Sequence, residues 1–181
     1  LSSNDIRVIT QDHSGRIWVG TSNGLNVFDP TTGAFTRYLA DPEDPSSLSN
    51  PVVTTIFEDK LGTIWVGTYG GGLSMLQGAQ NTFKVYQPDT NNPSSISGSS
   101  VSKILQDKNG NLWIGLVDQG NGLNRFDPLE QTFKAYLQGL NVYSLLLDGK
   151  DQLWAGTHIG LYKYNDEQDR FQHAGVSNSI T

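Results

Sequence analysis

Short runs of alternating apolar and polar residues follow one another along the chain, separated by segments rich in Gly, Asp, Asn and Ser. Such runs are typical of β-strands, and the polar segments between them are typical of tight turns. The runs form four sets with the same order. The first run of each set lies at 6–9, 53–57, 101–105 and 142–147, the third at 24–28, 72–76, 122–126 and 160–164, and the fourth at 35–38, 83–86, 133–136 and 171–173.

The second run of each set contains a tryptophan, and the four tryptophans are Trp18, Trp65, Trp113 and Trp154. Each lies in a phrase that starts with Asp and ends with Gly, as in residues 12–20, and each phrase is followed by Gly-Leu. The phrases recur about every 45 residues, a period typical of solenoids, arrays and propeller blades. The chain is therefore predicted to be a repeat protein.

Four strands per repeat, with no helical pattern, predict an all-β fold. We expect a β-propeller segment over residues 1–181, with about four four-stranded antiparallel blades at 1–47, 48–95, 96–140 and 141–175. Residues 176–181 would begin a fifth repeat. The first and second strands are apolar on both faces and should be buried on two sides, whereas the fourth strand should be half-exposed. The tryptophans should be wedged between neighbouring blades.

The connections also follow a pattern. The Asp-x-x-Gly segment before each tryptophan predicts a hairpin turn in which Asp accepts backbone hydrogen bonds. Asp151 replaces the glycine in the fourth repeat and puts that turn in question. The polar stretches 40–50 and 87–97 are expected to link successive blades, with Leu48 and Ile96 anchoring them to the sheets.

Composition excludes several function classes. Four repeats occupy nearly all of the 181 residues, which leaves no room for a separate catalytic module, and the net charge of −6 argues against binding to nucleic acid. The absence of cysteine excludes disulfides and thiolate metal sites. There is no apolar run of membrane-spanning length and no leader sequence, and residue 1 is Leu. We therefore expect the chain to be a section of a longer protein.

Candidate chemistry is sparse. The histidines are His13, His158 and His173, and none belongs to a nucleophile or hydrolase motif. Asp107, Asn109 and Asn111 have the oxygen spacing of calcium loops, but the other repeats do not share this set, which favours a capped turn. The sequence therefore predicts no catalytic residue, no metal and no cofactor.

The phrases at 59–68 and 107–115, each with its later Gly-Leu, closely resemble the two-component regulator propeller repeat. In that family the propeller is the extracytoplasmic sensor of a membrane-spanning signalling protein, such as a hybrid histidine kinase or a diguanylate cyclase, and its ligands include oligosaccharides. The resemblance implies a periplasmic domain attached to a membrane-spanning signalling module. Because the family commonly has seven blades, it also implies that these four belong to a larger propeller with further blades.

Ligands of propellers usually bind where the loops between second and third strands meet the blade linkers. The third such loop is longer than the others. We expect ligand-binding residues at Tyr69, Asp118, Gln119, Asn121 and His158, whose amide, carboxylate and aromatic groups suit sugar recognition. The alternative is that they are ordinary loop residues.

Three functions therefore stand at this point. The first is a non-catalytic sensor that binds a small solute or an oligosaccharide. The second is a protein-interaction or dimerisation platform, for instance in a homodimer. The third is a propeller lyase or glycosidase, which the lack of a paired acid and base disfavours.

Overall fold

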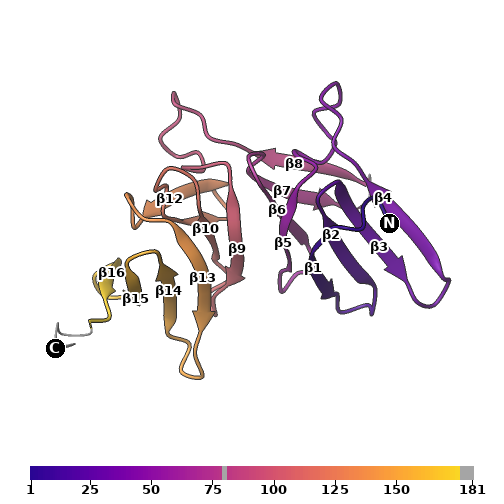
Figure 1. Cartoon of the computed structure of the whole chain (residues 1–181). Helices are drawn as coiled ribbons and strands as arrows, with labels where there is room; N and C mark the ends of the chain where they lie inside the picture. Colours follow the sequence, from indigo (N-terminus) through magenta and orange to yellow (C-terminus); the bar gives the residue numbers. More distant parts are fainter. Residues whose placement is uncertain (79–80, 176–181) are drawn as a thin grey trace.

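A computed structural model describes residues 1–78 and 81–175. The described residues form sixteen strands in four four-stranded antiparallel sheets, and each sheet contains four consecutive strands in chain order. The sheets stand side by side along an arc, and neighbouring sheets contact each other through their first strands (Figure 1). These observations confirm the prediction of an all-β propeller fold with four-stranded blades. The expected start of a fifth repeat at 176–181 lies outside the described residues.

Each sheet is one blade, numbered 1 to 4 in chain order. The first strands are β1 (Ile6–Gln11), β5 (Val53–Glu58), β9 (Val101–Gln106) and β13 (Val142–Leu147). The second strands are β2 (Ile17–Thr21), β6 (Ile64–Thr68), β10 (Leu112–Leu116) and β14 (Leu153–Thr157). The third strands are β3 (Gly24–Asp29), β7 (Leu73–Gln77), β11 (Leu123–Asp127) and β15 (Gly160–Asn165). The outer strands are β4 (Ala34–Tyr38), β8 (Thr82–Tyr86), β12 (Thr132–Tyr136) and β16 (Arg170–His173).

The turn between first and second strands, here called the aspartate turn, has the same construction in all four blades. One oxygen of its aspartate accepts the backbone N–H groups two and four residues later, as Asp59 does from Leu61 and Thr63 at 2.9 Å. The other oxygen accepts the indole N–H of the tryptophan, as from Trp65 at 2.8 Å. In blade 4, Asp151 takes a φ of 58°, so it adopts the left-handed conformation that glycine supplies elsewhere and the turn is kept.

The tryptophans fill the space between blades, as predicted for three of the four. Trp18, Trp65 and Trp113 are 1 %, 3 % and 1 % exposed, and each lies in an apolar cluster with residues of the next blade. Trp154, in the last described blade, is partly exposed. Large aromatic side chains supply most of the area buried in such clusters, so the tryptophans hold neighbouring blades together.

The glycine two residues after the tryptophan creates space for the next blade in blades 1 to 3. A Cβ atom on Gly67 would lie 2.6 Å from Cγ1 of Val101, the first residue of the next inner strand. The same relation joins Gly20 to Val53 at 2.5 Å. Valine thus sits directly on glycine backbone, and any larger residue would push the blades apart.

The prediction that both the first and second strands are buried on two sides is correct only for the second. In β6 and β10 every residue is buried, whereas β9 and β13 are each buried only at their first and fourth residues and β1 has no buried residue. In blades 2 and 3 the second strand is covered by a blade on each face. The first strand lines the inner side of the arc, where no further layer covers it.

The two long linkers are anchored as predicted. Leu48 and Ile96 are each 1 % exposed. Each linker also reaches the outer strand of the following blade, because Phe83 N–H donates to the Ser46 carbonyl at 2.7 Å and Phe133 N–H to the Ser94 carbonyl at 2.8 Å. The linker between β12 and β13 is short and spans residues 137–141.

Candidate functional site

The edge of the sheets at which the first strands begin is here called the loop edge. The loops between second and third strands lie there, each bonded to the residue before the first strand of its own blade: Tyr69 N–H donates to the Val52 carbonyl at 2.9 Å and His158 N–H to the Asn141 carbonyl at 3.3 Å. Tyr69 and His158 therefore occupy the same position in blades 2 and 4. The long linkers rise above this edge at the top of Figure 1.

Asp118, in the loop edge of blade 3, is held by internal hydrogen bonds. Its Oδ2 accepts the backbone N–H of Ser99, the Ser99 hydroxyl and the backbone N–H of Ser100, all at 3.0 Å. Burial raises the pKa of this carboxyl, but the donated hydrogen bonds outweigh burial and hold the pKa below its ordinary value. Asp118 thus ties the loop to the linker from blade 2.

Asn121 also has an internal role. Its amide donates to Asp118 Oδ1 at 3.3 Å, and its carbonyl accepts the Ser97 hydroxyl at 2.9 Å. Its backbone pairs with Leu140 of the short linker in an isolated parallel bridge. This contact explains why the loop of blade 3 is longer than the other loops. The linker between blades 3 and 4 is short, and the loop extends to meet it.

The remaining three predicted residues present side chains to solvent. Tyr69 is 62 % exposed, and Gln119 is exposed on a left-handed backbone with a φ of 50°. His158 is exposed, and its Nδ1 accepts the backbone N–H of Asn141 at 3.2 Å. The structure thus divides the five residues into three accessible side chains and two that position the loop.

A cavity of about 720 Å³ lies between the first linker and blade 2. None of the five predicted residues lines it. Its walls include Asn23, Asp41, Pro42, Ser47, Val85 and Gln87. The sequence signal that could have located it is the length and proline content of the 40–50 linker, which must rise from one blade before it bonds to the next.

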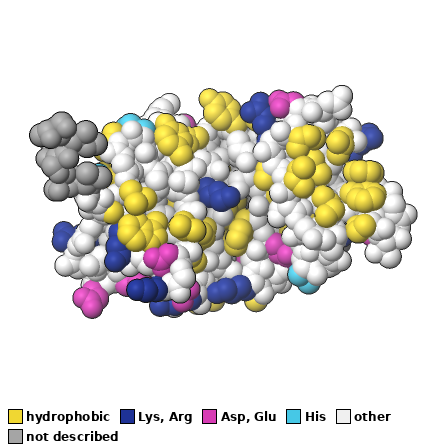
Figure 2. All heavy atoms as spheres, turned by 60° about the horizontal axis from the view of Figure 1, so that its bottom comes forward, with side chains coloured by type: hydrophobic (Ala, Val, Ile, Leu, Met, Phe, Trp, Pro, Cys, Tyr) yellow, Lys and Arg dark blue, Asp and Glu magenta, His cyan; other side chains and the backbone are white. Residues whose placement is uncertain are grey.

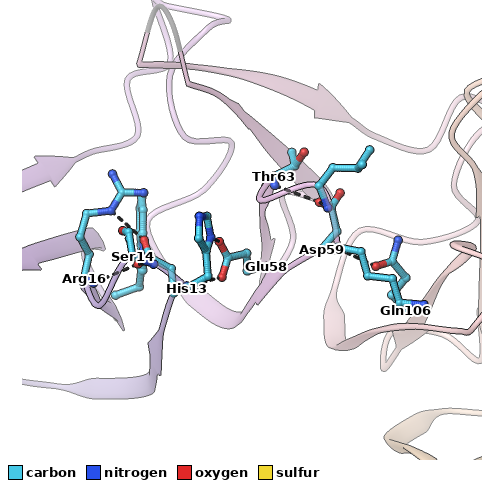
Figure 3. A network of polar contacts seen from close by, with 11 residues as sticks. His13, Ser14, Arg16, Glu58, Asp59, Thr63 and Gln106 are labelled. Atoms are coloured by element: carbon cyan, nitrogen blue, oxygen red, sulfur yellow. Dashed lines mark hydrogen bonds and ion pairs between the residues drawn. The ribbon is translucent and has the colours of Figure 1, made fainter.

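The opposite edge carries the aspartate turns, and its polar contacts join one blade to the next (Figure 3). The N–H of the residue after the turn aspartate donates to the side chain that precedes the next turn: His13 to Glu58 Oε2, and Lys60 to Gln106 Oε1, both at 2.8 Å. The His13 ring also pairs with Glu58. These contacts are structural links between blades.

The turn aspartates are fully engaged. Asp107 accepts from the backbone N–H groups of Asn109 and Asn111, the Asn111 amide and the Trp113 indole. The alternating oxygens noticed in the sequence therefore serve the turn. Among the residues that the structure describes, no group of three or more His, Asp or Glu side chains is arranged to hold a metal ion.

Comparisons with known proteins agree with this architecture. The family model of the two-component regulator propeller matches residues 1–23, 47–70 and 95–118, which carry the first strands and aspartate turns of blades 1 to 3. Three of the four repeats therefore match the two-component regulator propeller repeat over their first half. The resemblance noted in the sequence is confirmed.

Individual relatives are similar over parts of their length. A histidine kinase from Formosa agariphila is 47 % identical over 49 residues, which cover 27 % of this chain and 3 % of the kinase. The extracellular domain of the hybrid two-component system BT4673 of B. thetaiotaomicron is 25 % identical, with a TM-score of 0.76 over 95 % of this chain and 24 % of that chain. The extracellular domain of BT3049 from the same organism is 21 % identical, with a TM-score of 0.71 over 95 % of this chain and 30 % of that one.

The chain thus spans less than a third of each of these relatives. Within residues 1–78 and 81–175, no helix is long and apolar enough to cross a membrane.

Proposed function

We propose that the chain is a non-catalytic, extracytoplasmic part of a sensor in a bacterial two-component system. The observation that carries this proposal is the match of three repeats to the two-component regulator propeller. Propellers of similar structure form the extracellular domains of BT4673 and BT3049, and a histidine kinase shares the repeat sequence. The partners would be further blades and a membrane-spanning signalling module of the same protein, and the location would be the periplasm.

The loop edge would bind a small solute, of which an oligosaccharide fits the side chains best. Tyr69 offers a ring face with a hydroxyl, Gln119 offers an amide, and the exposed His158 offers its second ring nitrogen, Nε2. Sugars are recognised by this combination of an apolar ring and groups that both donate and accept hydrogen bonds. Asp118 and Asn121 would position the loop that carries Gln119.

A glycan array followed by calorimetry on the propeller tests the site. Tyr69→Ala and Gln119→Ala should each weaken a bound glycan by roughly tenfold, about 1.4 kcal/mol, without changing thermal stability. Asp118→Ala should weaken binding and also lower stability, because Ser99 and Ser100 lose their acceptor. Leu61→Ala is the matched control, since Leu61 is 90 % exposed at the edge of the aspartate turns. Unchanged affinity in both Tyr69→Ala and Gln119→Ala would refute the site.

A further inference from the structure

A cavity of about 490 Å³, here called the wedge, lies between blades 2 and 3 at the edge that carries the aspartate turns, the turn edge. Its apolar walls come from both blades and are Leu61, Trp65, Leu112, Pro128 and Leu129. Because both of these blades have a neighbour on each side, further blades at either end of the array would leave the wedge open. Figure 2, in which the turn edge is turned towards the viewer, shows hydrophobic side chains beside Lys and Arg side chains.

Two leucines that line the wedge are the most exposed large hydrophobic residues in the described part of the chain. Leu61 and Leu129 are each 90 % exposed. Their turns do not require leucine, because each residue supplies its backbone N–H to the aspartate two residues earlier, at 2.9 Å. Asn109 and Thr31 make the same bond at the equivalent positions of other blades. An exposed apolar surface with no role in the turns indicates a binding site.

The equivalent place between blades 3 and 4 is polar and almost filled. Asn109 and Asp166 stand there in place of Leu61 and Pro128, and the remaining space is about 20 Å³. The tryptophan, the turn aspartate and the first residue of the next second strand line both spaces. The open apolar wedge is therefore a feature of the junction between blades 2 and 3, and the repeat alone does not explain it.

Two lysines give the wedge a positive side. Lys60 and Lys108 both line it, and among the described residues neither belongs to an ion pair. Lys60 Nζ donates to the backbone carbonyls of Asp107 and Lys108 at 2.8 and 3.3 Å, which hold the ammonium group in place without neutralising its charge. The acidic walls are Asp59 and Asp127, whose carboxylates accept backbone N–H groups of their own turns. An anionic group is the electrostatic complement of the two lysines.

We propose that the wedge binds a small carboxylate with an apolar body, such as a medium-chain fatty acid. The apolar body would lie between Leu61 and Leu129, next to Trp65, and the carboxylate would pair with Lys108 and Lys60. The volume falls in the range of about 300–1,000 Å³ that is usual for small-molecule sites, whose walls are mostly apolar with a few polar or charged groups. The proposal is independent of solute binding at the loop edge, because the two sites lie at opposite edges of the blades.

Titration of the chain with sodium octanoate, followed by nuclear magnetic resonance, tests the site. We expect saturable shifts of the backbone amides of Leu61, Lys108 and Leu129. Octylammonium has the same apolar chain and the opposite charge, so the two lysines should make it bind about tenfold more weakly than octanoate.

Substitutions taken from other blades remove the apolar side chains while keeping the turns. Leu61→Asn introduces the residue found at Asn109, and Leu129→Thr introduces the residue found at Thr31. The melting temperature of each variant should stay close to that of the parent chain, because the same turns form with these residues. Each variant should weaken octanoate binding by roughly tenfold, since a leucine no longer covers the apolar chain.

A pair of lysine variants tests the charge. Lys108→Gln should weaken octanoate binding by about threefold, because one of the two ammonium groups is lost. Lys150→Gln is the matched control and should leave the affinity unchanged, since Lys150 is exposed in the aspartate turn of blade 4 and does not line the wedge. The proposal is overturned by any of three results: no saturable shift at the three amides, equal binding of octanoate and octylammonium, or unchanged octanoate affinity in both leucine variants.

Discussion

The junctions between blades 1 and 2 and between blades 2 and 3 share two kinds of polar contact, one from a long linker and one from an aspartate turn, that the junction between blades 3 and 4 does not have in the described residues. In the first two, a long linker bonds to the next outer strand, and an N–H of one aspartate turn bonds to Glu58 or Gln106. In the third, the linker is short and Leu147 occupies the acceptor position. In the described residues, the third junction therefore has neither the hydrogen bond from a long linker nor the hydrogen bond from an aspartate turn.

A charged network replaces them. Asp169, in the turn between β15 and β16, accepts the Tyr136 hydroxyl at 2.7 Å and pairs with Arg125 at 3.2 Å, and it also pairs with Lys134 and accepts the Tyr164 hydroxyl. Tyr136, Arg125 and Lys134 belong to blade 3. The Arg125 guanidinium lies over the rings of Trp113 and Tyr136 at 5.6 and 5.7 Å.

The same turn position carries much less in the other junctions. Asn81 accepts one bond from Tyr38 at 3.2 Å, and Gln131 accepts one from Lys84. All three turn residues share a left-handed backbone, with φ between 45° and 55°. The repeat therefore places inter-blade contacts at the same positions in every blade. The number of contacts made at a given position differs from one junction to another.

The largest expected effect comes from the core that all junctions share. Trp65→Ala should lower the free energy of unfolding by roughly 3–5 kcal/mol, the range for removing a large buried aromatic side chain. Trp154→Ala should cost about half as much, because Trp154 is partly exposed. Urea melts measure both, and equal losses would show that the last blade is as well covered as the second.

The next effect separates the junctions directly. Asp169→Ala should cost roughly 1–3 kcal/mol, since it removes an acceptor shared by two tyrosines and two cations, reduced by the partial exposure of the site. Gln131→Ala, at the same turn position between blades 2 and 3, should cost under about 0.5 kcal/mol. Similar losses in the two variants would contradict the comparison.

Acid and alkali should both weaken this network. Burial raises the pKa of the Asp169 carboxyl, but the hydrogen bonds from Lys134, Tyr164 and Tyr136 lower it more, so its pKa lies below the ordinary value. The ionised Asp169 carboxylate therefore stabilises the fold at pH values above the pKa of aspartate in the unfolded chain, which is about 4. This stabilisation is lost as the pH falls below that value. Burial and the bond to Asp169 raise the pKa of Tyr164 to about 12, so its contribution is present below pH 10 and lost towards pH 12.

Denaturant melts across pH, followed by tryptophan fluorescence, measure these slopes. Asp169→Asn should flatten the acid slope, because the amide does not titrate. Asp166→Asn, an exposed aspartate in the same turn, is the control. Identical acid slopes in the parent chain and Asp169→Asn would show that the network does not contribute.

Most of the fold could be predicted from the sequence because its signals are local and repeated. The phrase from Asp59 to Gly67 contains the turn, the indole partner and the seat for the next valine within nine residues. The exposure of β1 and Trp154 could not be predicted, because it depends on which blades have neighbours. The hydrophobic pattern of a strand shows which of its faces can be buried, but it does not show whether a neighbouring blade covers that face.

The candidate site was less predictable. Polar residue type singled out Asp118 and Asn121, yet both side chains bond to groups of the protein itself. The partners of Asp118 lie about 20 residues earlier, in the linker, and no local pattern connects the two segments. The Asn121 side chain bonds to Asp118 itself. The Asp169 network could not be predicted from the sequence for the same reason, because the partners of Asp169 in blade 3 lie more than 30 residues away.

A smaller loss of stability is expected from removing the hydrogen bonds that form within each long linker. The Ser47 hydroxyl accepts Asp41 N–H at 2.9 Å, and Ser95 does the same for Asp89 at 3.0 Å. Ser47→Ala and Ser95→Ala should each cost about 1 kcal/mol and speed hydrogen exchange at Phe83 or Phe133 in the respective outer strand. If exchange at these amides is unchanged, the linkers do not fasten the blades as we describe.

The smallest effect concerns the turn edge, where the question is whether charge or hydrogen bonding matters. Glu58 and Gln106 accept an equivalent backbone N–H, one as a carboxylate and the other as an amide. The position therefore needs an acceptor rather than a charge. Glu58→Gln should stay within about 0.5 kcal/mol of the parent chain because His13 is mostly exposed and its ion pair is screened.

Glu58→Ala should lose more than Glu58→Gln, by about 0.5–1.5 kcal/mol, because His13 N–H then has no protein acceptor at that position. Paired urea melts at low and high salt separate the two contributions, since salt screens the ion pair but leaves the backbone hydrogen bond. If Glu58→Gln loses as much as Glu58→Ala, and salt removes the difference from the parent chain, the link between blades 1 and 2 is ionic. Its counterpart at Gln106 would then be a different kind of contact.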